Sequence, residues 1–193
     1  MPVQWMVGTN GDDKQVSIKV RALVVDGRVR EYVVGPPHEV TEQVFVVRRV
    51  LRVNDALPED AAPKWQWQRG GWLLVDRLTG RISAVNLQEF DVVYSASSWH
   101  RDYVAYCGVS DDGKKTFAIV AQLNRKKPVL KKLLLRVLPD DAGPDSACSA
   151  PAWQRSPIRV SFETPGADKQ TFAIHGHIAG IVNDYEEDEE ASK

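Results

Sequence analysis

Apolar and polar residues alternate along much of this chain, and a period of two is the pattern of a β-strand with one buried face. The clearest example is the segment 16–24, where every second position is apolar: Val16, Ile18, Val20, Ala22 and Val24. Asp26-Gly27 follows, a dipeptide favoured in type I′ turns, so the segment 29–34 is expected to return as the partner strand.

Three more hairpins are expected from the same combination of alternation and turn residues. Their strand pairs are 72–75 with 82–87, 103–109 with 116–123, and 158–163 with 171–177. The valine-rich segment 40–53 predicts a long strand, with Arg48 or Arg49 marking a bulge or an edge. No segment shows a convincing apolar period of 3.6 residues. The prediction is therefore an all-β protein of antiparallel hairpins, arranged as propeller-blade-like sheets, a sandwich or an open barrel.

The length of 193 residues fits one generous domain or two small ones, and it is enough to bury a proper core. We expect a single β domain over residues 1–183, with an N-terminal sheet over about 1–60 and blade-like sheets over about 61–183. The two glycines at 70 and 71 are expected to interrupt the chain between strands. Residues 184–193 hold six acidic residues and one lysine, a composition that predicts a disordered acidic tail.

One stretch resembles a known repeat. The segment 103–132, YVAYCGVSDDGKKTFAIVAQLNRKKPVLKK, is similar to a blade of TolB-like β-propellers, in which a strand ending in an Asp-Gly-Lys turn precedes an apolar strand and a proline-led strand. The segment 72–87, WLLVDRLTGRISAVNL, resembles the outer strand pair of another blade. Propellers of this type mostly bind proteins or small ligands, and none of their catalytic motifs is present. A closed propeller needs at least four blades of roughly 40 residues, which this chain would barely supply.

The chain contains two cysteines. Cys107 lies in an apolar strand, whereas Cys148 lies in a loop-like stretch that offers no packing reason for a cysteine. A disulfide between Cys107 and Cys148 is one interpretation, and it implies an oxidising compartment. The alternative is one buried and one exposed free thiol.

Six tryptophans exceed what a chain of this length usually holds. Trp65 and Trp67 lie on one strand face beside the two glycines, where missing side chains would leave a shallow aromatic cleft. We expect a ligand-binding region around Trp65, Trp67, Trp72 and Trp99 that takes a protein, a peptide or a carbohydrate. The alternative is that these rings cap the core.

Two other functions are weighed against this one. His175 and His177 have the spacing that places two imidazoles on one strand face, so a metal-dependent hydrolase is an alternative, although two further metal ligands are not apparent. The basic stretch 125–136 suggests single-stranded nucleic-acid binding, but the acidic tail and the modest charge of the rest of the chain argue against a polyanion. We assign no catalytic residue, no metal site and no cofactor.

No apolar run approaches the roughly 18 residues of a membrane span, and no basic-then-apolar leader begins the chain. A leader removed before this sequence begins would leave the same pattern. The sequence thus predicts a non-catalytic binding or structural β module, periplasmic or extracellular, with a cytoplasmic location as the alternative.

Overall fold

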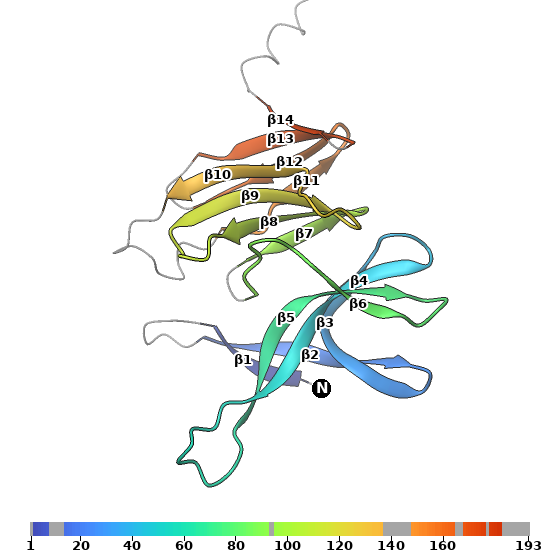
Figure 1. Ribbon diagram of the computed structural model, residues 1–193, viewed down its shortest axis with the longest axis vertical. Helices are drawn as coiled ribbons and strands as arrows, with labels where there is room; N and C mark the ends of the chain where they lie inside the picture. Colours follow the sequence, from blue (N-terminus) through green and yellow to red (C-terminus); the bar gives the residue numbers. More distant parts are fainter. Residues whose placement is uncertain are drawn as a thin grey trace, which may run out of the picture. The chain divides into compact units, whose positions relative to one another are not determined.

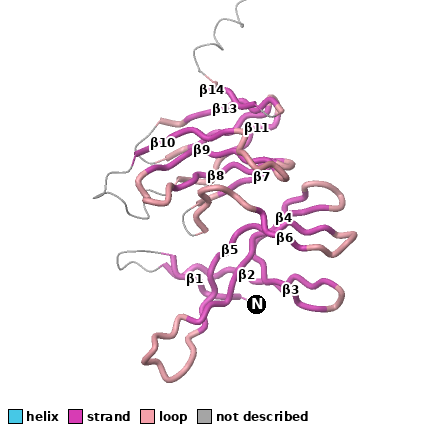
Figure 2. The backbone as a smooth tube through the Cα atoms, in the orientation of Figure 1, coloured by secondary structure: helices cyan, strands magenta, loops and turns pink. Residues whose placement is uncertain are grey.

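The computed structural model in Figure 1 describes residues 2–7, 14–92, 95–136, 148–164, 168–176 and 178–182. Every regular element in these residues is a β-strand (Figure 2). Neighbouring strands run antiparallel in three open sheets. The all-β class predicted from the sequence is therefore confirmed. The described part of the chain contains no helix long and apolar enough to cross a membrane. The acidic segment 184–193 and the segment 137–147 lie outside the described residues.

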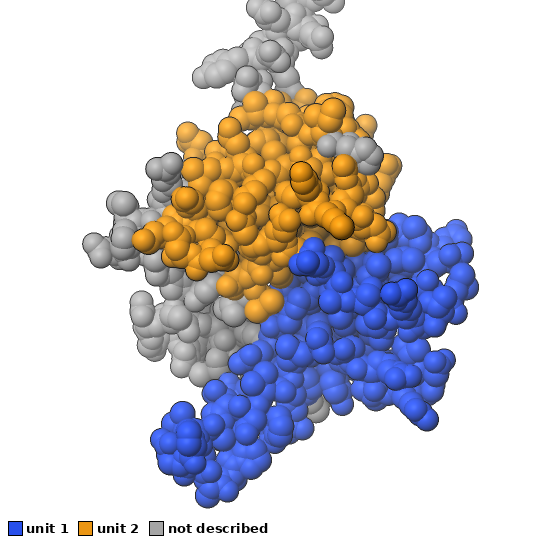
Figure 3. Space-filling model, viewed as in Figure 1, with its two compact units in different colours: residues 1–86 blue, residues 87–193 orange. Residues whose placement is uncertain are grey.

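The chain divides into two compact units, residues 1–86 and residues 87–193 (Figure 3). The first unit is one six-stranded sheet whose strands pair in chain order. These strands are β1 (Pro2–Val7), β2 (Lys14–Val25), β3 (Arg28–Glu39), β4 (Val44–Asn54), β5 (Trp65–Asp76) and β6 (Ile82–Val85). The sheet that we expected to end near residue 60 thus continues to Val85, because β4 pairs with β5 across the loop between them.

The β2–β3 hairpin has the turn that its sequence predicts. Asp26 and Gly27 have φ angles of 51° and 71°, so both central residues are left-handed, as a type I′ turn requires. Asp26 tolerates this conformation because its short polar side chain suits it, and glycine has no Cβ to clash.

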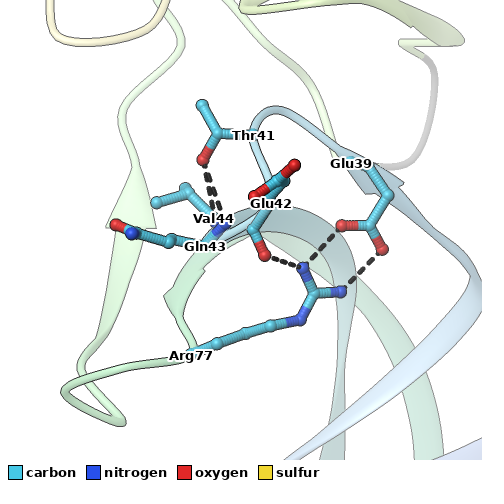
Figure 4. A network of polar contacts seen from close by, with 6 residues as sticks. All are labelled: Glu39, Thr41, Glu42, Gln43, Val44 and Arg77. Carbon is cyan, nitrogen blue, oxygen red and sulfur yellow. Dashed lines mark hydrogen bonds and ion pairs between the residues drawn. The ribbon is translucent and has the colours of Figure 1, made fainter.

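Side chains link the turn between β3 and β4 to the turn between β5 and β6 (Figure 4). Thr41 Oγ1 accepts a hydrogen bond of 3.1 Å from the backbone N–H of Val44, which tightens the β3–β4 turn. The guanidinium of Arg77, in the β5–β6 turn, donates to the carboxylate of Glu39 and to the backbone carbonyl of Glu42. These contacts fix two neighbouring turns at the same end of the sheet.

Alternating residues of β3, β4 and β5 build the core of the first unit. Val33, Val47, Leu73 and Val75 form one buried cluster, against which the half-buried Leu23, Phe45 and Ile82 pack. On the opposite face, three further valines are buried, namely Val20, Val46 and Val50. Both faces of β4 are buried near Val46 and Val47, which accounts for the nearly continuous run of apolar residues in its sequence. The predicted long strand therefore lies inside the sheet, between β3 and β5.

The second unit contains two four-stranded sheets. The first has the order β10-β9-β8-β7 and consists of β7 (Ser97–His100), β8 (Tyr103–Val109), β9 (Lys115–Gln122) and β10 (Leu130–Arg136). The second consists of β11 (Ala152–Arg155), β12 (Ile158–Phe162), β13 (Gln170–His175) and β14 (Ile178–Ile181). One core cluster joins both sheets, with Val120 of β9 and Phe162 and Phe172 of β12 and β13 among its members. The two sheets therefore pack face to face.

The other face of the β7–β10 sheet is covered by the segment that precedes β7. Leu87 and Phe90 pack there against Tyr106 and Ile119, and the phenol of Tyr106 donates a hydrogen bond of 2.8 Å to the carbonyl of Gln88. Burial raises the pKa of this phenol well above its ordinary value. Covered on both faces, β8 is buried along almost its whole length.

Cys107 and Cys148 form a disulfide with a Cα–Cα distance of 6.1 Å, and both cysteines are buried in the second unit. The predicted pair is thus confirmed. The segment that resembles a propeller blade forms most of the β7–β10 sheet, whereas 72–87 contributes the β5–β6 pair of the first unit. The propeller resemblance itself stays a prediction.

Candidate functional site

An irregularity in the pairing of β4 and β5 decides which way the tryptophans of β5 face. Arg48 pairs with Trp72 and Val50 pairs with Arg69, so β5 holds one residue more than β4 in this interval. The extra residue is accommodated at Gly70-Gly71 as a β-bulge. Without it, Trp67 and Trp72 would face opposite sides of the sheet, because side chains alternate along a strand. With it, both tryptophans face the same side.

Strand β5 therefore does not break at the two glycines, as the sequence had suggested, but runs from Trp65 to Asp76. Glycine fits the bulge because a Cβ at Gly70 would lie 3.3 Å from the Cβ of Arg49. Arg49 itself is held by an ion pair of 2.9 Å with Glu31 of β3. The Arg48–Arg49 dipeptide was expected at a bulge or an edge, and it lies opposite this bulge.

The loop 55–64 closes the β4–β5 hairpin at the end where Trp65 lies (Figure 1). The side-chain oxygen of Asn54 accepts hydrogen bonds from the backbone N–H groups of Ala56 and Lys64, at 3.2 and 2.8 Å. Asp60 accepts from Lys64 at 2.7 Å, and this contact lowers the pKa of the Asp60 carboxyl below its ordinary value. Gln66 of β5 donates a hydrogen bond of 2.9 Å to the carboxylate of Asp55, so the loop contacts both strands that it connects.

A groove of about 750 Å³ lies on the face of the sheet that carries these tryptophans. We call it the aromatic groove, and its described lining residues come from β2, β3, β4 and β5: Val20, Arg21, Ala22, Tyr32, Arg52, Trp65 and Trp67. Its volume falls in the range of known small-molecule sites. The register explains the grouping, because Tyr32 pairs with Ala22 on one side and Arg52 pairs with Trp67 on the other.

The aromatic rings of the groove are arranged by two contacts. The ring of Tyr32 meets that of Trp67 edge to face, with centroids 5.1 Å apart and planes at 72°. The guanidinium carbon of Arg52 lies 5.0 Å from the ring centroid of Trp65, the geometry of a cation–π contact. Despite these contacts, Trp65 is 51% exposed and Tyr32 is 42% exposed. The groove therefore presents aromatic surface to solvent.

The four tryptophans predicted as one binding region separate into different surroundings. Trp65 and Trp67 line the aromatic groove, as just described. Trp72 lies on the same face of β5 but beyond the bulge, half-buried, with the guanidinium of Arg48 5.6 Å from its ring centroid. Trp99 belongs to the second unit, where it packs half-buried against the cluster that contains Val104. Only two of the four thus line this groove.

Comparison with protein-family models, with curated proteins and with solved structures finds no match for this chain. The interpretation of the groove therefore depends on its own residues.

Tyr32, Arg21 and Arg52 are site residues that the sequence analysis did not find. They lie 13 to 44 positions before Trp65 in the chain, and only the strand register brings them beside it. The sequence contains one signal for Arg52, the alternation along β4, which places Arg52 and Asn54 on the same face as the buried Val50. Alternation alone does not tell which β4 residue pairs with which β5 residue.

Of the two histidines considered as metal ligands, the structure describes His175. Strand β13 ends at the exposed His175, and Gly176, with φ of 57°, begins the turn to β14. The strand that we expected through residue 177 is therefore shorter, because left-handed φ breaks the extended conformation. His177 lies outside the described residues. Among the residues that the structure describes, no group of three or more His, Cys, Asp or Glu side chains is placed to hold a metal ion.

Two neighbouring lysines of the basic stretch 125–136 have different surroundings. Lys131 forms an ion pair of 2.8 Å with Glu89, and its ammonium lies 4.7 Å from the ring centroid of Phe117. Its neighbour Lys132 is exposed on β10, where successive side chains face opposite sides. Lys131 thus fastens the segment before β7 to the sheet, and nucleic-acid binding through this stretch stays a prediction.

Proposed function

We propose that this chain is a non-catalytic binding module whose ligand occupies the aromatic groove. The observation that carries the proposal is the exposure of Trp65 and Tyr32 in a concave site, together with the half-buried Trp67. Large aromatic side chains contribute most to folding when they are buried, whereas exposed aromatic side chains in a groove contribute to ligand binding. A protein, a peptide or a carbohydrate are the partner classes that such a surface serves.

Preorganisation supports the same proposal. Trp65 is held by Arg52 and Trp67 by Tyr32, so a ligand would meet side chains that already have few conformations to lose. The bound loop 55–64 fixes the backbone at Trp65 in the same way, through Asn54. These contacts support the proposal because a groove held in this way needs little rearrangement to bind a ligand.

We further propose that the protein works outside the cytoplasm, in the periplasm or the extracellular space. The support is the disulfide between the buried Cys107 and Cys148, since disulfides persist mainly in oxidising compartments. Intact mass of the protein from its native source, after alkylation with and without reductant, tests this. Alkylation of both cysteines in denaturant without reductant would favour the cytoplasmic alternative.

Capture on an array of immobilised oligosaccharides and peptides tests the binding function. Trp65→Ala should reduce capture of the bound ligand by at least about tenfold, corresponding to about 1.4 kcal/mol, while the melting temperature changes little because the side chain is exposed. Leu78→Ala is the matched control, since Leu78 is 73% exposed in the β5–β6 turn and does not line the groove. Unfolding of Trp65→Ala, or unchanged capture by a folded Trp65→Ala, contradicts the proposal.

A further inference from the structure

The polar groups that line the aromatic groove are almost all hydrogen-bond donors. Arg52 carries only N–H donors, and so do the indoles of Trp65 and Trp67. The side chain of Arg21, which pairs with Val33, belongs to the opposite face of the sheet. The phenol oxygen of Tyr32 is the one side-chain acceptor among the described lining residues. A ligand that satisfies such a lining must bring acceptors. The hydroxyls of a neutral sugar are donors as well as acceptors, whereas a carboxylate or a sulfate is an acceptor alone and matches this lining better.

The charge of the lining points the same way. The described lining residues include two arginines and no carboxylate. Arg21 donates to the backbone carbonyl of Gly35, whereas Arg52 has no ion-pair partner among the residues that the structure describes. Arg52 carries five N–H donors, so contact of its guanidinium with the ring of Trp65 leaves donors for an anion. One fixed cationic group thus lies beside exposed aromatic surface.

Single-stranded nucleic acids and extended peptides fit the lining of the groove less well than a compact anionic ligand does. A single-stranded nucleic acid needs a row of cations for its phosphates, but residues 1–86 hold 12 Lys or Arg against 10 Asp or Glu. An extended peptide that adds a strand needs a sheet edge, and the groove residues lie on β2 to β5, which are paired on both sides. A compact ligand with one or two negative groups is the better match.

We infer that the aromatic groove binds an anionic saccharide, in which a sugar ring carries a carboxylate or a sulfate. The C–H face of the ring packs on the aromatic surface of Trp65 and Trp67, because the negative face of an aromatic ring attracts weakly positive C–H groups. The carboxylate or sulfate accepts hydrogen bonds from Arg52, a pairing that suits the planar guanidinium. This inference rests on the proposed binding function and adds the class of ligand.

Titration calorimetry on the full chain with its disulfide intact tests the inference. The probes are a sulfated disaccharide, a disaccharide containing a uronic acid, and the neutral disaccharide with the same rings and linkage. We expect at least one anionic probe to bind about tenfold or more tightly than the neutral one, because charge-assisted hydrogen bonds are about twice as strong as neutral ones. The sulfated and the carboxylated probe distinguish the two sources of the charge.

Arg52→Gln should remove this preference while Arg81→Gln retains it, since Arg81 lies in the β5–β6 turn at the other end of β5 from Trp65. The melting temperatures of both variants verify that they fold. Binding of the three disaccharides with equal affinity, binding of none of them, or tighter binding of an acidic peptide or a single-stranded oligonucleotide overturns the inference. The proposed function fails separately, if Trp65→Ala leaves capture on the array unchanged.

Discussion

The guanidinium of Arg77 forms two hydrogen bonds of 2.7 Å with the two carboxylate oxygens of Glu39, 38 residues earlier in the chain. The same guanidinium lies over the ring of Phe45, 4.7 Å from its centroid, so its face and its edge are both used. Two parallel N–H···O bonds make this a bidentate pair, which is more specific in geometry than a single ion pair. The hydrogen bonds from Arg77 lower the pKa of the Glu39 carboxyl below its ordinary value.

This pair predicts a pH dependence of stability. A carboxyl whose pKa is lower in the folded state stabilises the fold above its unfolded pKa of about 4.3, and this contribution disappears as the pH falls through the folded value. Glu39→Gln should therefore be less stable than the wild type at pH 7, by a small amount because the pair is exposed, and the difference should vanish in acid. Urea unfolding at pH 7 and at stepwise lower pH measures it. Glu42→Gln is the control, since only the backbone carbonyl of Glu42 contacts Arg77.

Loss of the disulfide should destabilise the second unit. The bond closes a loop with a sequence separation of 41, for which the chain-entropy model gives about 4 kcal/mol. Denaturant unfolding with and without reductant should show a loss of about 2–5 kcal/mol. The double variant Cys107→Ala/Cys148→Ala should be insensitive to reductant. If reductant shifts the wild-type transition no more than that of the double variant, the bond contributes nothing to stability.

Gly108 should not tolerate a side chain. A Cβ at this position of β8 would lie 2.4 Å from Cδ1 of Ile119 and 3.2 Å from the carbonyl oxygen of Glu89, which accepts a hydrogen bond from Val109. Gly108→Ala should therefore cost about 1–3 kcal/mol, the range of overpacked cores. Gly180→Ala on β14 is matched, because a Cβ there meets nothing within 4 Å, and it should change stability by less than about 0.5 kcal/mol. Equal stability of the two variants would contradict the close approach of the segment before β7.

Local patterns predicted the strands and turns well because each depends on neighbours in sequence. Asp26-Gly27 is an example, since both residues have the left-handed φ that the dipeptide indicates. The four-residue strands β7, β11 and β14 were not predicted, because so few positions show no clear alternation. The pairing of Cys107 with Cys148 was inferred from context, and the structure confirms it.

The groove was predicted only in part, for a different reason. Trp65 and Trp67 stood out by residue type and spacing, but their partners Tyr32 and Arg52 belong to other strands. Which residues lie beside one another depends on strand register, and register depends on long-range packing and on bulges. Gly70-Gly71 suggested a break between strands. In the structure the two glycines form a bulge within a strand, a distinction that needs the partner strand to be known.

The bulge at Gly70-Gly71 gives the most direct test of how the groove is built. Deleting Gly71 removes the extra residue, and the pairing of Leu73 with Val47, both buried, should keep the C-terminal half of β5 in place. Trp65 and Trp67 would then turn to the opposite face of the sheet. Array capture should fall by at least about tenfold in a protein that keeps its β circular dichroism spectrum. Gly71→Ala keeps the residue count, and a Cβ there meets nothing within 4 Å, so this variant should bind like the wild type. Wild-type capture by the deletion variant would show that the orientation of Trp65 and Trp67 does not determine binding.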